Sequence, residues 1–448
     1  MNNSTALAGT ARGKTMVRLL KGAALLAACI LAGLLAMTAV YAIPAEYVRG
    51  NLEASSEILS SEGLRYEVIP GYRNSRLDTF TDAIMLANAM VMPEDSALKN
   101  ALLAHRLDSP HSVAALEQYL ADEQSVATTP YSYYWHGYLT VLKPLLCVMS
   151  LGSIRFLLMA AQVLLMMAVA ALLGGRGMTR FILPLLAMAV CLCPQALMNC
   201  LTYSTVFTIG MIAAVVILLA HERLERLGYG YAFLLVGALT SFFDFLTYPV
   251  FTLGVPLAVL VLLLMESGER VRFSRLAGLC AAWGVGYGGM WAGKWVLVSA
   301  LTDVNGIEAA VSEILFRTSS TMEHGGDVEP LAGLLACMEQ LLDPLCLLVL
   351  ALCGLACVAL LVKRGVRREA AAGVGALALI ALLPVVWLSL TCNHSVTHAF
   401  YTYRSLTVMV FAVLCIPLAA AGERRSTRQV GGHGTRGANG SQQEDTGA

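Results

Sequence analysis

The sequence predicts an all-α polytopic membrane protein with about ten transmembrane helices and a large helical first extracytoplasmic loop. Three observations support this prediction: the composition, a series of long apolar runs, and the placement of Lys and Arg between those runs. Of the 448 residues, 57% are hydrophobic and 13% are charged, whereas soluble domains have roughly 45–50% apolar and about 25% charged residues. This composition argues against an ordinary cytosolic enzyme and against a nucleic-acid-binding protein.

The chain contains ten apolar runs of about the length that a helix needs to cross a bilayer, which is roughly 20 residues. They lie at residues 22–42, 153–174, 179–198, 203–221, 231–248, 250–266, 277–300, 343–362, 371–391 and 405–421. The first run follows four basic residues, as in a signal peptide, but it is longer than the roughly 7–15 apolar residues of such a peptide. We therefore expect a retained membrane anchor.

These runs divide the chain into five parts. They are a cytoplasmic N-terminus (1–16), a first transmembrane helix (17–43), an extracytoplasmic loop with amphipathic helices (44–152), a membrane domain of about nine helices (153–421) and a disordered cytoplasmic tail (422–448). Within the loop, residues 96–120 have the pattern of two short amphipathic helices separated at Ser109–Pro110.

The distribution of Lys and Arg predicts the orientation, because short cytoplasmic loops are enriched in these residues. With the N-terminus in the cytoplasm, the inner segments contain 19 of the 30 Lys and Arg residues, and the short outer turns around residues 201–204 and 245–250 contain none. We expect a multi-pass protein of the cytoplasmic membrane with both termini in the cytoplasm. A second outer loop, residues 301–342, contains a single Lys or Arg residue, Arg317.

Ionisable side chains at membrane depth are costly and indicate functional sites, and four polar clusters lie at the predicted outer ends of the helices. The first is RLDTFTD at residues 76–82, where Asp78 and Asp82 share one face of a helix. Two carboxylates can bind a divalent metal, or one can act as a general base toward an acceptor hydroxyl, and Asp78 is the stronger candidate. Arg76 of the same motif is a candidate substrate-binding residue. The alternative is a surface helix in which Arg73 and Arg76 pair with the carboxylates.

The second cluster is an aromatic segment, YSYYWHGYLTVLKPL at residues 131–145, followed by Arg155. His136, Lys143 and Arg155 together are suited to binding a lipid that carries a phosphate. A simpler alternative is an aromatic belt at the membrane surface, with the basic side chains extending to the interface.

The third cluster is SFFDFLTYP at residues 241–249, with Asp244 about one turn inside the predicted outer end of a helix. A charge at this depth requires a partner, and Lys294 and Arg404 are the candidates. A structural ion pair and a role in a binding site both remain open.

The fourth cluster is NHSVTHAFYTYR at residues 393–404. His394 and His398 are four residues apart and can bind a metal, but no HExxH-type Glu accompanies them. Recognition of sugar hydroxyls or of a phosphate suits the set better, and it includes Asn393, His394, His398, Tyr401 and Arg404. The alternative is an interfacial loop with belt aromatics.

This arrangement resembles the GT-C superfamily of integral-membrane glycosyltransferases, which have a cytoplasmic N-terminus, many spans and an acidic residue in a large first outer loop. The resemblance implies a polyprenyl-phosphate sugar as donor and a glycan or a lipid as acceptor. It also implies that Asp78, or Asp82 in second place, is the catalytic base or a ligand of a divalent metal ion. Arg155, Lys294 and Arg404 are, by position, the residues that would hold the donor phosphate.

Two other functions compete with this interpretation. A transporter or flippase for a lipid-linked or polar solute is the main alternative, although the polar groups lie at the outer ends of the spans rather than at the bilayer midplane. A noncatalytic protein of envelope assembly is the other. Because the chain has neither a P-loop nor a Gly-rich nucleotide fingerprint, nucleotide-driven chemistry is not expected, and the expected partners are membrane lipids rather than nucleic acids.

Overall fold

The computed structural model describes residues 2–64, 66–319, 327–329 and 331–422. The prediction of an all-α protein with membrane-spanning helices is confirmed: most of the described chain is helical, and its one small antiparallel sheet consists of β1 (Arg106–Leu107) and β2 (Thr128–Thr129). The predicted disordered tail lies, except for its first residue, outside the described residues.

Each of the ten predicted spans overlaps an apolar helix. They are α1 (Asn2–Tyr41), α7 (Leu151–Gly175), α8 (Ile182–Leu192), α10 (Leu201–Leu227), α11 (Tyr229–Phe243), α12 (Val250–Glu266), α13 (Phe273–Leu301), α16 (Pro344–Arg364), α17 (Ala371–Leu390) and α20 (Thr407–Ala420). Within the described residues, six segments are both long and apolar enough to cross a membrane: those of α1, α7, α10, α16 and α17, and residues 399–420, which contain α20. The helices α8, α11 and α12 are shorter, and Gly, Trp and Lys294 make α13 less apolar. The count of ten spans therefore stays a prediction.

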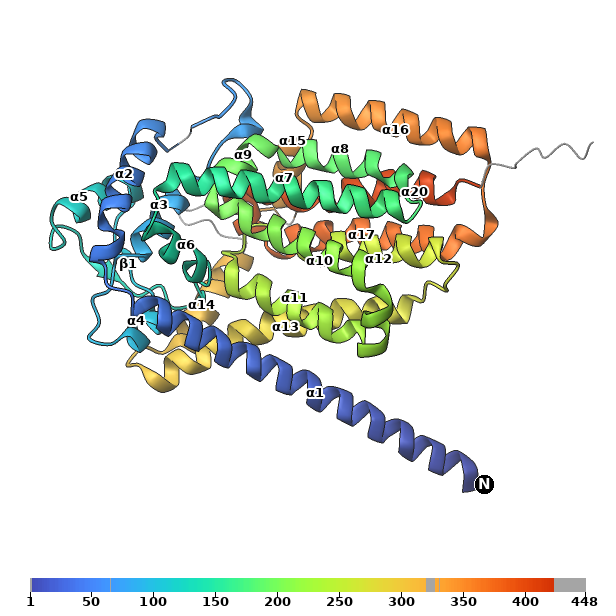
Figure 1. The fold of residues 1–448 in the computed structure, drawn as a ribbon, viewed down its shortest axis with the longest axis horizontal. Helices are drawn as coiled ribbons and strands as arrows, with labels where there is room; N and C mark the ends of the chain where they lie inside the picture. Colours follow the sequence, from blue (N-terminus) through green and yellow to red (C-terminus); the bar gives the residue numbers. More distant parts are fainter. Residues whose placement is uncertain (1, 65, 320–326, 330, 423–448) are drawn as a thin grey trace, which may run out of the picture.

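The predicted first loop forms a helical layer at one end of the bundle, which we call the cap (Figure 1). It contains α2 (Glu46–Glu62), α3 (Thr79–Asn88), α4 (Ala97–Leu103), α5 (Ser112–Ala121) and α6 (Leu139–Leu146), and α14 (Gly306–Thr318) lies at the same end. In the segment predicted to form two amphipathic helices, α4 ends at Leu103 and α5 begins at Ser112, with β1 between them. The helix α1 begins at the opposite end, where Val366 pairs with Ala421 just after α20.

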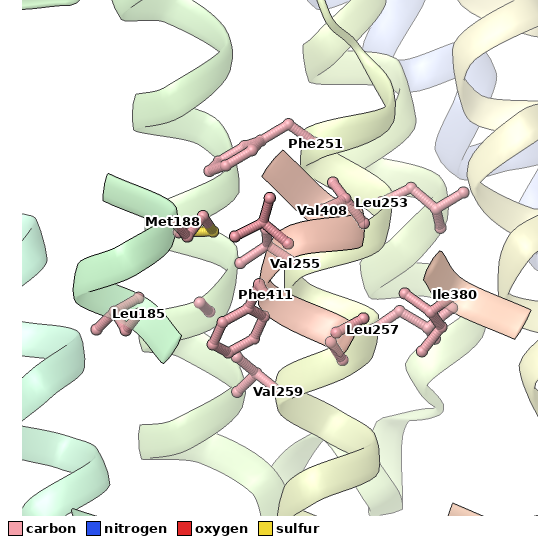
Figure 2. Packing of buried hydrophobic residues seen from close by; sticks show 14 of the residues in the cluster. Leu185, Met188, Phe251, Leu253, Val255, Leu257, Val259, Ile380, Val408 and Phe411 are labelled. Atoms are coloured by element: carbon pink, nitrogen blue, oxygen red, sulfur yellow. The ribbon is translucent and has the colours of Figure 1, made fainter. Parts of the chain in front are cut away.

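The centre of the bundle is α12, a helix buried on all sides. Every residue from Val250 to Leu264 is buried, and its neighbours are α10, α11, α17 and α20. Figure 2 shows Phe251 and Val255 of α12 packed near Val408 and Phe411 of α20. A helix that is hydrophobic around its whole circumference belongs in such a position, because protein rather than lipid surrounds it.

Two glycines bring α11 and α13 into close contact. A Cβ atom on Gly237 would lie 2.1 Å from the carbonyl oxygen of Trp283, and one on Gly286 would lie 2.0 Å from that of Leu234. Small residues allow such close packing of helix backbones in membranes. The spacing of α11 and α13 therefore depends on these two positions.

We expect Gly237→Ala and Gly286→Ala each to destabilise the protein by about 1–3 kcal/mol, the usual effect of overpacking. Thermal unfolding of the purified protein in detergent measures this loss. The control is Gly288→Ala on the same helix, because a Cβ there has no atom within 4 Å and Ala favours the helix. Equal melting temperatures for Gly286→Ala and Gly288→Ala would contradict the expectation.

Candidate functional site

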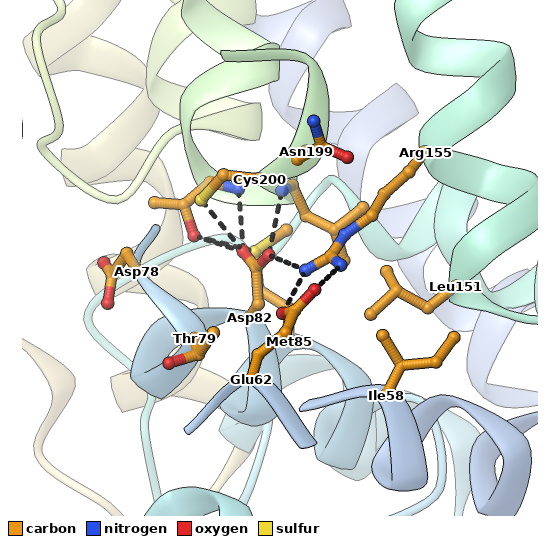
Figure 3. Close-up of polar contacts among 12 residues, drawn as sticks. Ile58, Glu62, Asp78, Thr79, Asp82, Met85, Leu151, Arg155, Asn199 and Cys200 are labelled. Atoms are coloured by element: carbon orange, nitrogen blue, oxygen red, sulfur yellow. Dashed lines mark hydrogen bonds and ion pairs between the residues drawn. The ribbon is translucent and has the colours of Figure 1, made fainter. Parts of the chain in front are cut away.

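Asp82 lies at the junction of the cap and the bundle, where it closes the N-terminus of α10 (Figure 3). Its carboxylate accepts hydrogen bonds from the backbone N–H groups of Leu201 and Thr202, both at 3.1 Å, and from the Thr202 hydroxyl at 2.9 Å. An acceptor at this position satisfies donors that an α-helix leaves unpaired. Asp82 is fully buried, and its contacts are those of a structural residue.

Arg155 connects the same junction to α2. It donates two hydrogen bonds to Glu62, at 2.5 and 3.0 Å, and its Nη2 lies 4.0 Å from Asp82 Oδ2. The guanidinium thus joins α7 to α2 and α3 in a buried network. Arg155 therefore holds the cap on the bundle. These contacts favour a structural role over the predicted phosphate-binding role.

Asp78 has a different environment from Asp82. It is the N-cap of α3, where its Oδ1 accepts a hydrogen bond from Thr81 N at 3.1 Å. Its Oδ2 is buried and has no hydrogen-bond partner among the described residues. Burial raises the pKa of Asp78 to about 6, with a further contribution from the charge of Asp82, while hydrogen bonding to Thr81 and the charge of Arg76 oppose the shift. A carboxyl group with such a pKa can exchange a proton near neutral pH.

The predicted surface helix around these carboxylates is wrong. Asp78 is 4% exposed and Asp82 is 0% exposed, because the cap and α10 cover α3. Arg73 pairs with Glu339 and Asp343 instead, and the Arg76 guanidinium lies 4.6 Å from the centre of the Phe400 ring.

The pair of carboxylates does not fit the predicted divalent metal. The Asp78 and Asp82 side chains point in different directions in Figure 3, and the oxygens of Asp82 are occupied by α10. Among the described residues, the group with three ligand atoms close enough for a metal is His221, Glu225 and Glu269, on the inner loops of the predicted topology. We therefore assign no metal-dependent step to Asp78 and Asp82.

The fourth polar cluster surrounds Arg317, on α14. Arg317 Nη1 lies 2.6 Å from His394 Nδ1 and 3.4 Å from His398 Nε2, and Arg317 Nε donates to Glu313 at 2.6 Å. Since a guanidinium can only donate, both imidazole nitrogens accept. The other nitrogen of His394 donates to the Leu246 carbonyl at 2.8 Å.

Both histidines are therefore neutral. Burial lowers the pKa of His394 far below its usual range, and the charges of His398 and Arg317 add to this effect. Burial and Arg317 lower the pKa of His398 to about 3. Because a guanidinium occupies the lone pairs that a metal would need, the arrangement argues against the metal alternative for His394 and His398. Asn393 also contacts α14, donating to the Phe316 carbonyl at 3.1 Å.

Tyr401 packs between His398 and a residue of α10. Its ring stacks on His398 with 5.0 Å between ring centres and lies 6.2 Å from the ring of Tyr203. Tyr401 thus packs the fourth cluster against the first turn of α10.

His136 belongs to an aromatic wall beside this region. Its Nε2 donates to the Tyr131 carbonyl at 2.8 Å, and its Nδ1 accepts from the Tyr138 hydroxyl at 3.2 Å. Its ring also lies 5.2 Å from that of Phe245. Burial lowers the pKa of His136 to about 3, so the ring is neutral. The role in phosphate binding predicted for His136 is not favoured by these contacts.

Three further basic residues that the sequence placed in the site are fully buried and already bonded. Lys294 Nζ donates to the Ala101 carbonyl at 2.7 Å, and Lys143 Nζ lies 3.2 Å from the Met92 sulfur. Arg404 donates to the carbonyls of Leu192, Phe400 and Asn74 and lies 4.0 Å from the centre of the Tyr203 ring. The contacts of Lys294 with Ala101 and of Arg404 with Asn74 connect the bundle to the cap, whereas the contact of Lys143 lies within the cap.

Asp244 does not form the predicted ion pair with Lys294 or Arg404 among the described residues. Its carboxylate accepts hydrogen bonds from the backbone N–H of Thr247, at 3.1 and 3.2 Å, and from the Thr247 hydroxyl. Asp244 therefore closes the turn between α11 and α12.

Sequence analysis missed Arg317 as a site residue. Its side chain keeps 19% of its surface exposed, whereas Lys143, Lys294 and Arg404 are 0% exposed. One signal was available, since Arg317 is the only Lys or Arg in the second predicted outer loop. Its partners could not be identified because His394 lies 77 residues further along the chain.

A lateral groove of about 630 Å³ follows α10 along its length, between α7 on one side and α1 and α11 on the other. Its walls are almost entirely apolar. At the cap end the groove reaches Met85 on α3, Tyr138 and Leu201, and at the opposite end it reaches Leu227 and Tyr231. α10 has 27 residues and is therefore about 40 Å long.

Comparisons of this chain with protein-family models, with curated proteins and with solved structures found no match. The functional argument therefore depends on the geometry of the site itself.

Proposed function

We propose that this chain is a membrane glycosyltransferase that transfers a sugar from a polyprenyl-phosphate donor to an acceptor on the outer face of the cytoplasmic membrane. In this proposal ten helices span the bilayer, both termini are cytoplasmic and the cap lies outside. The acceptor is a glycan or a lipid.

The groove along α10 is the observation that supports this proposal best. An apolar groove open to the side of the bundle suits a long hydrocarbon chain, and its lining reaches both ends of the 27-residue helix α10. The cap end of the groove reaches Met85, which lies on the same short helix that Asp78 begins. A lipid in the groove would therefore place its phosphate near α3.

Asp78 on the cap and Arg317 on α14 are the groups to which we assign the chemistry of transfer. Asp78 would act as general base, because its Oδ2 is buried without a hydrogen-bond partner in the described chain and its pKa of about 6 allows proton uptake near neutral pH. Arg317 would bind the donor phosphate, since its guanidinium is oriented by Glu313 and His394 and remains partly exposed. The sugar–phosphate bond breaks as the deprotonated acceptor hydroxyl attacks the anomeric carbon, and the polyprenyl phosphate leaves.

A second candidate function is movement of a lipid-linked solute across the membrane. The same groove favours it, because its lining extends to both ends of α10. The two functions are distinguished by what they change: transfer makes a glycosylated acceptor, whereas movement leaves the lipid-linked solute chemically unchanged.

The test measures sugar transfer from radiolabelled polyprenyl-phosphate sugars by the purified protein in liposomes. We expect transfer by the wild type and a loss of at least tenfold in Ala232→Trp, because the indole would fill the groove that Ala232 lines. The control is Ala161→Trp on α7, which is exposed and outside the groove.

Two results would contradict the proposal. If folded wild-type protein transfers sugar from none of the donors, the glycosyltransferase proposal is contradicted and lipid movement is favoured. Movement of labelled lipid across the membrane of the same liposomes then tests that alternative. Equal transfer rates for Ala232→Trp and the wild type would show that the donor does not bind in the groove.

A further inference from the structure

A histidine and two glutamates meet at the end of the bundle opposite the cap (Figure 1). His221 and Glu225 lie one turn apart near the end of α10, and Glu269 lies in the loop between α12 and α13. One ligand atom of each residue lies within 4.8 Å of the other two. Two ligand atoms at about 2.0–2.2 Å from one ion can lie up to about 4.4 Å apart. Both glutamates are exposed, so small rotations of their side chains bring all three atoms onto one ion.

The ring of His221 is held in the way that a metal-binding imidazole is held. The side chain is buried, with its Nδ1 2.7 Å from the Tyr229 hydroxyl and its Nε2 3.0 Å from Glu269 Oε1. A hydrogen bond at one ring nitrogen fixes the ring and directs the other nitrogen at the ion. At 3.0 Å the His221 nitrogen and the Glu269 oxygen share a proton in the metal-free protein, and a metal ion replaces this proton when it binds.

Arg275 supports the second carboxylate from outside. It donates a hydrogen bond to Glu225 Oε1, and its guanidinium lies 5.2 Å from the centre of the Tyr229 ring. Because a carboxylate has two oxygens, Glu225 can bind an ion through one of them and keep its bond to Arg275. The same arginine therefore contacts one ligand and the tyrosine that orients another. Outer contacts of this kind are a regular part of metal sites.

The three ligands are accessible to an ion from solvent. A cavity of about 610 Å³ is lined by Glu269, Arg275 and the loop residues between them. An ion can enter from this side without unfolding of the bundle, and water can occupy its remaining coordination positions. One imidazole nitrogen and two carboxylate oxygens suit Mn²⁺ or Zn²⁺, whereas Mg²⁺ prefers oxygen ligands.

We propose that His221, Glu225 and Glu269 bind a divalent transition-metal ion, Mn²⁺ or Zn²⁺, which ties the end of α10 to the loop before α13. In the predicted topology this site faces the cytoplasm. The same end of α10 supplies Leu224 and Leu227 to the lining of the apolar groove. The ion therefore fixes the inner end of the groove. This inference does not depend on the proposed transfer activity.

The test adds Mn²⁺ to the full-length protein in detergent, after EDTA has removed bound metal and has itself been removed. Electron paramagnetic resonance measures free Mn²⁺, so the loss of its signal counts the bound ions. Mn²⁺ is the probe because the 12 cysteines of the chain are poor ligands for it. We expect about one bound ion per chain, displaced by Zn²⁺. The melting temperature should rise with the concentration of either ion.

Glu269→Gln and His221→Gln should each weaken Mn²⁺ binding by at least about tenfold, since the loss of an outer contact alone typically costs about 10–100-fold. Glu269 is exposed, so its substitution should leave the fold intact. The control is Glu222→Gln, an exposed carboxylate on the same turn of α10 and outside the group of three, and its affinity should equal that of the wild type.

Three outcomes would overturn the inference. The first is that the folded wild type retains neither Mn²⁺ nor Zn²⁺. The second is equal Mn²⁺ affinity in the wild type and Glu269→Gln, which would place the ion elsewhere. The third is displacement of Mn²⁺ by Mg²⁺ as readily as by Zn²⁺, which would exclude the imidazole of His221 as a ligand.

Discussion

Asp78→Asn is expected to reduce sugar transfer by about 10²–10⁴-fold, the usual contribution of general base catalysis. The amide cannot take the proton of the acceptor hydroxyl, although it can still cap α3, since Asn and Asp are equally good N-caps. The loss should therefore occur in folded protein. Transfer rates in liposomes and thermal unfolding of the same preparation measure both properties.

The matched control is Asp95→Asn. Asp95 is an exposed carboxylate whose side chain is 83% accessible and which pairs only with Lys99 among the described residues, so full transfer is expected. If folded Asp78→Asn transfers sugar at the wild-type rate, Asp78 is not the general base. The rest of the proposal would be unaffected.

The pH dependence gives a second readout of Asp78. The base must be deprotonated, so transfer should rise with pH through about 6 and then level off. Stability should change in the opposite direction. The folded protein binds this proton more tightly than the unfolded chain, so the free energy of unfolding falls between about pH 4 and the folded pKa of about 6. Asp78→Asn should remove both effects.

Arg155→Met is expected to destabilise the protein by about 3–5 kcal/mol, because breaking a buried ion pair leaves uncompensated charges. The carboxylates of Glu62 and Asp82 would lose their shared cation, and their side chains are 13% and 0% exposed. Chemical or thermal unfolding in detergent measures the loss.

The double variant Arg155→Met with Glu62→Gln is the control for charge. It should regain part of the lost stability, because only Asp82 remains charged and α10 still donates hydrogen bonds to it. A loss of less than 1 kcal/mol in the single variant, or no recovery in the double variant, would contradict a structural role for this network.

The sequence predicted the apolar helices well because hydropathy is a local property. The ten runs overlap helices, and α5 begins directly after Ser109–Pro110, although α4 already ends at Leu103. The roles of the polar residues depend on contacts between distant segments. Asp82 binds α10 some 120 residues later, and Arg404 reaches Asn74 across 330 residues. A single sequence does not contain these pairings, so buried structural cations were interpreted as ligand-binding groups.

The burial of α12 has a consequence for biosynthesis. This helix is synthesised before α17 and α20, two of the helices that surround it. Until then its Val and Leu side chains lack neighbours that bury them in the folded bundle. A chain truncated before residue 407 lacks α20, so one side of α12 would be left uncovered.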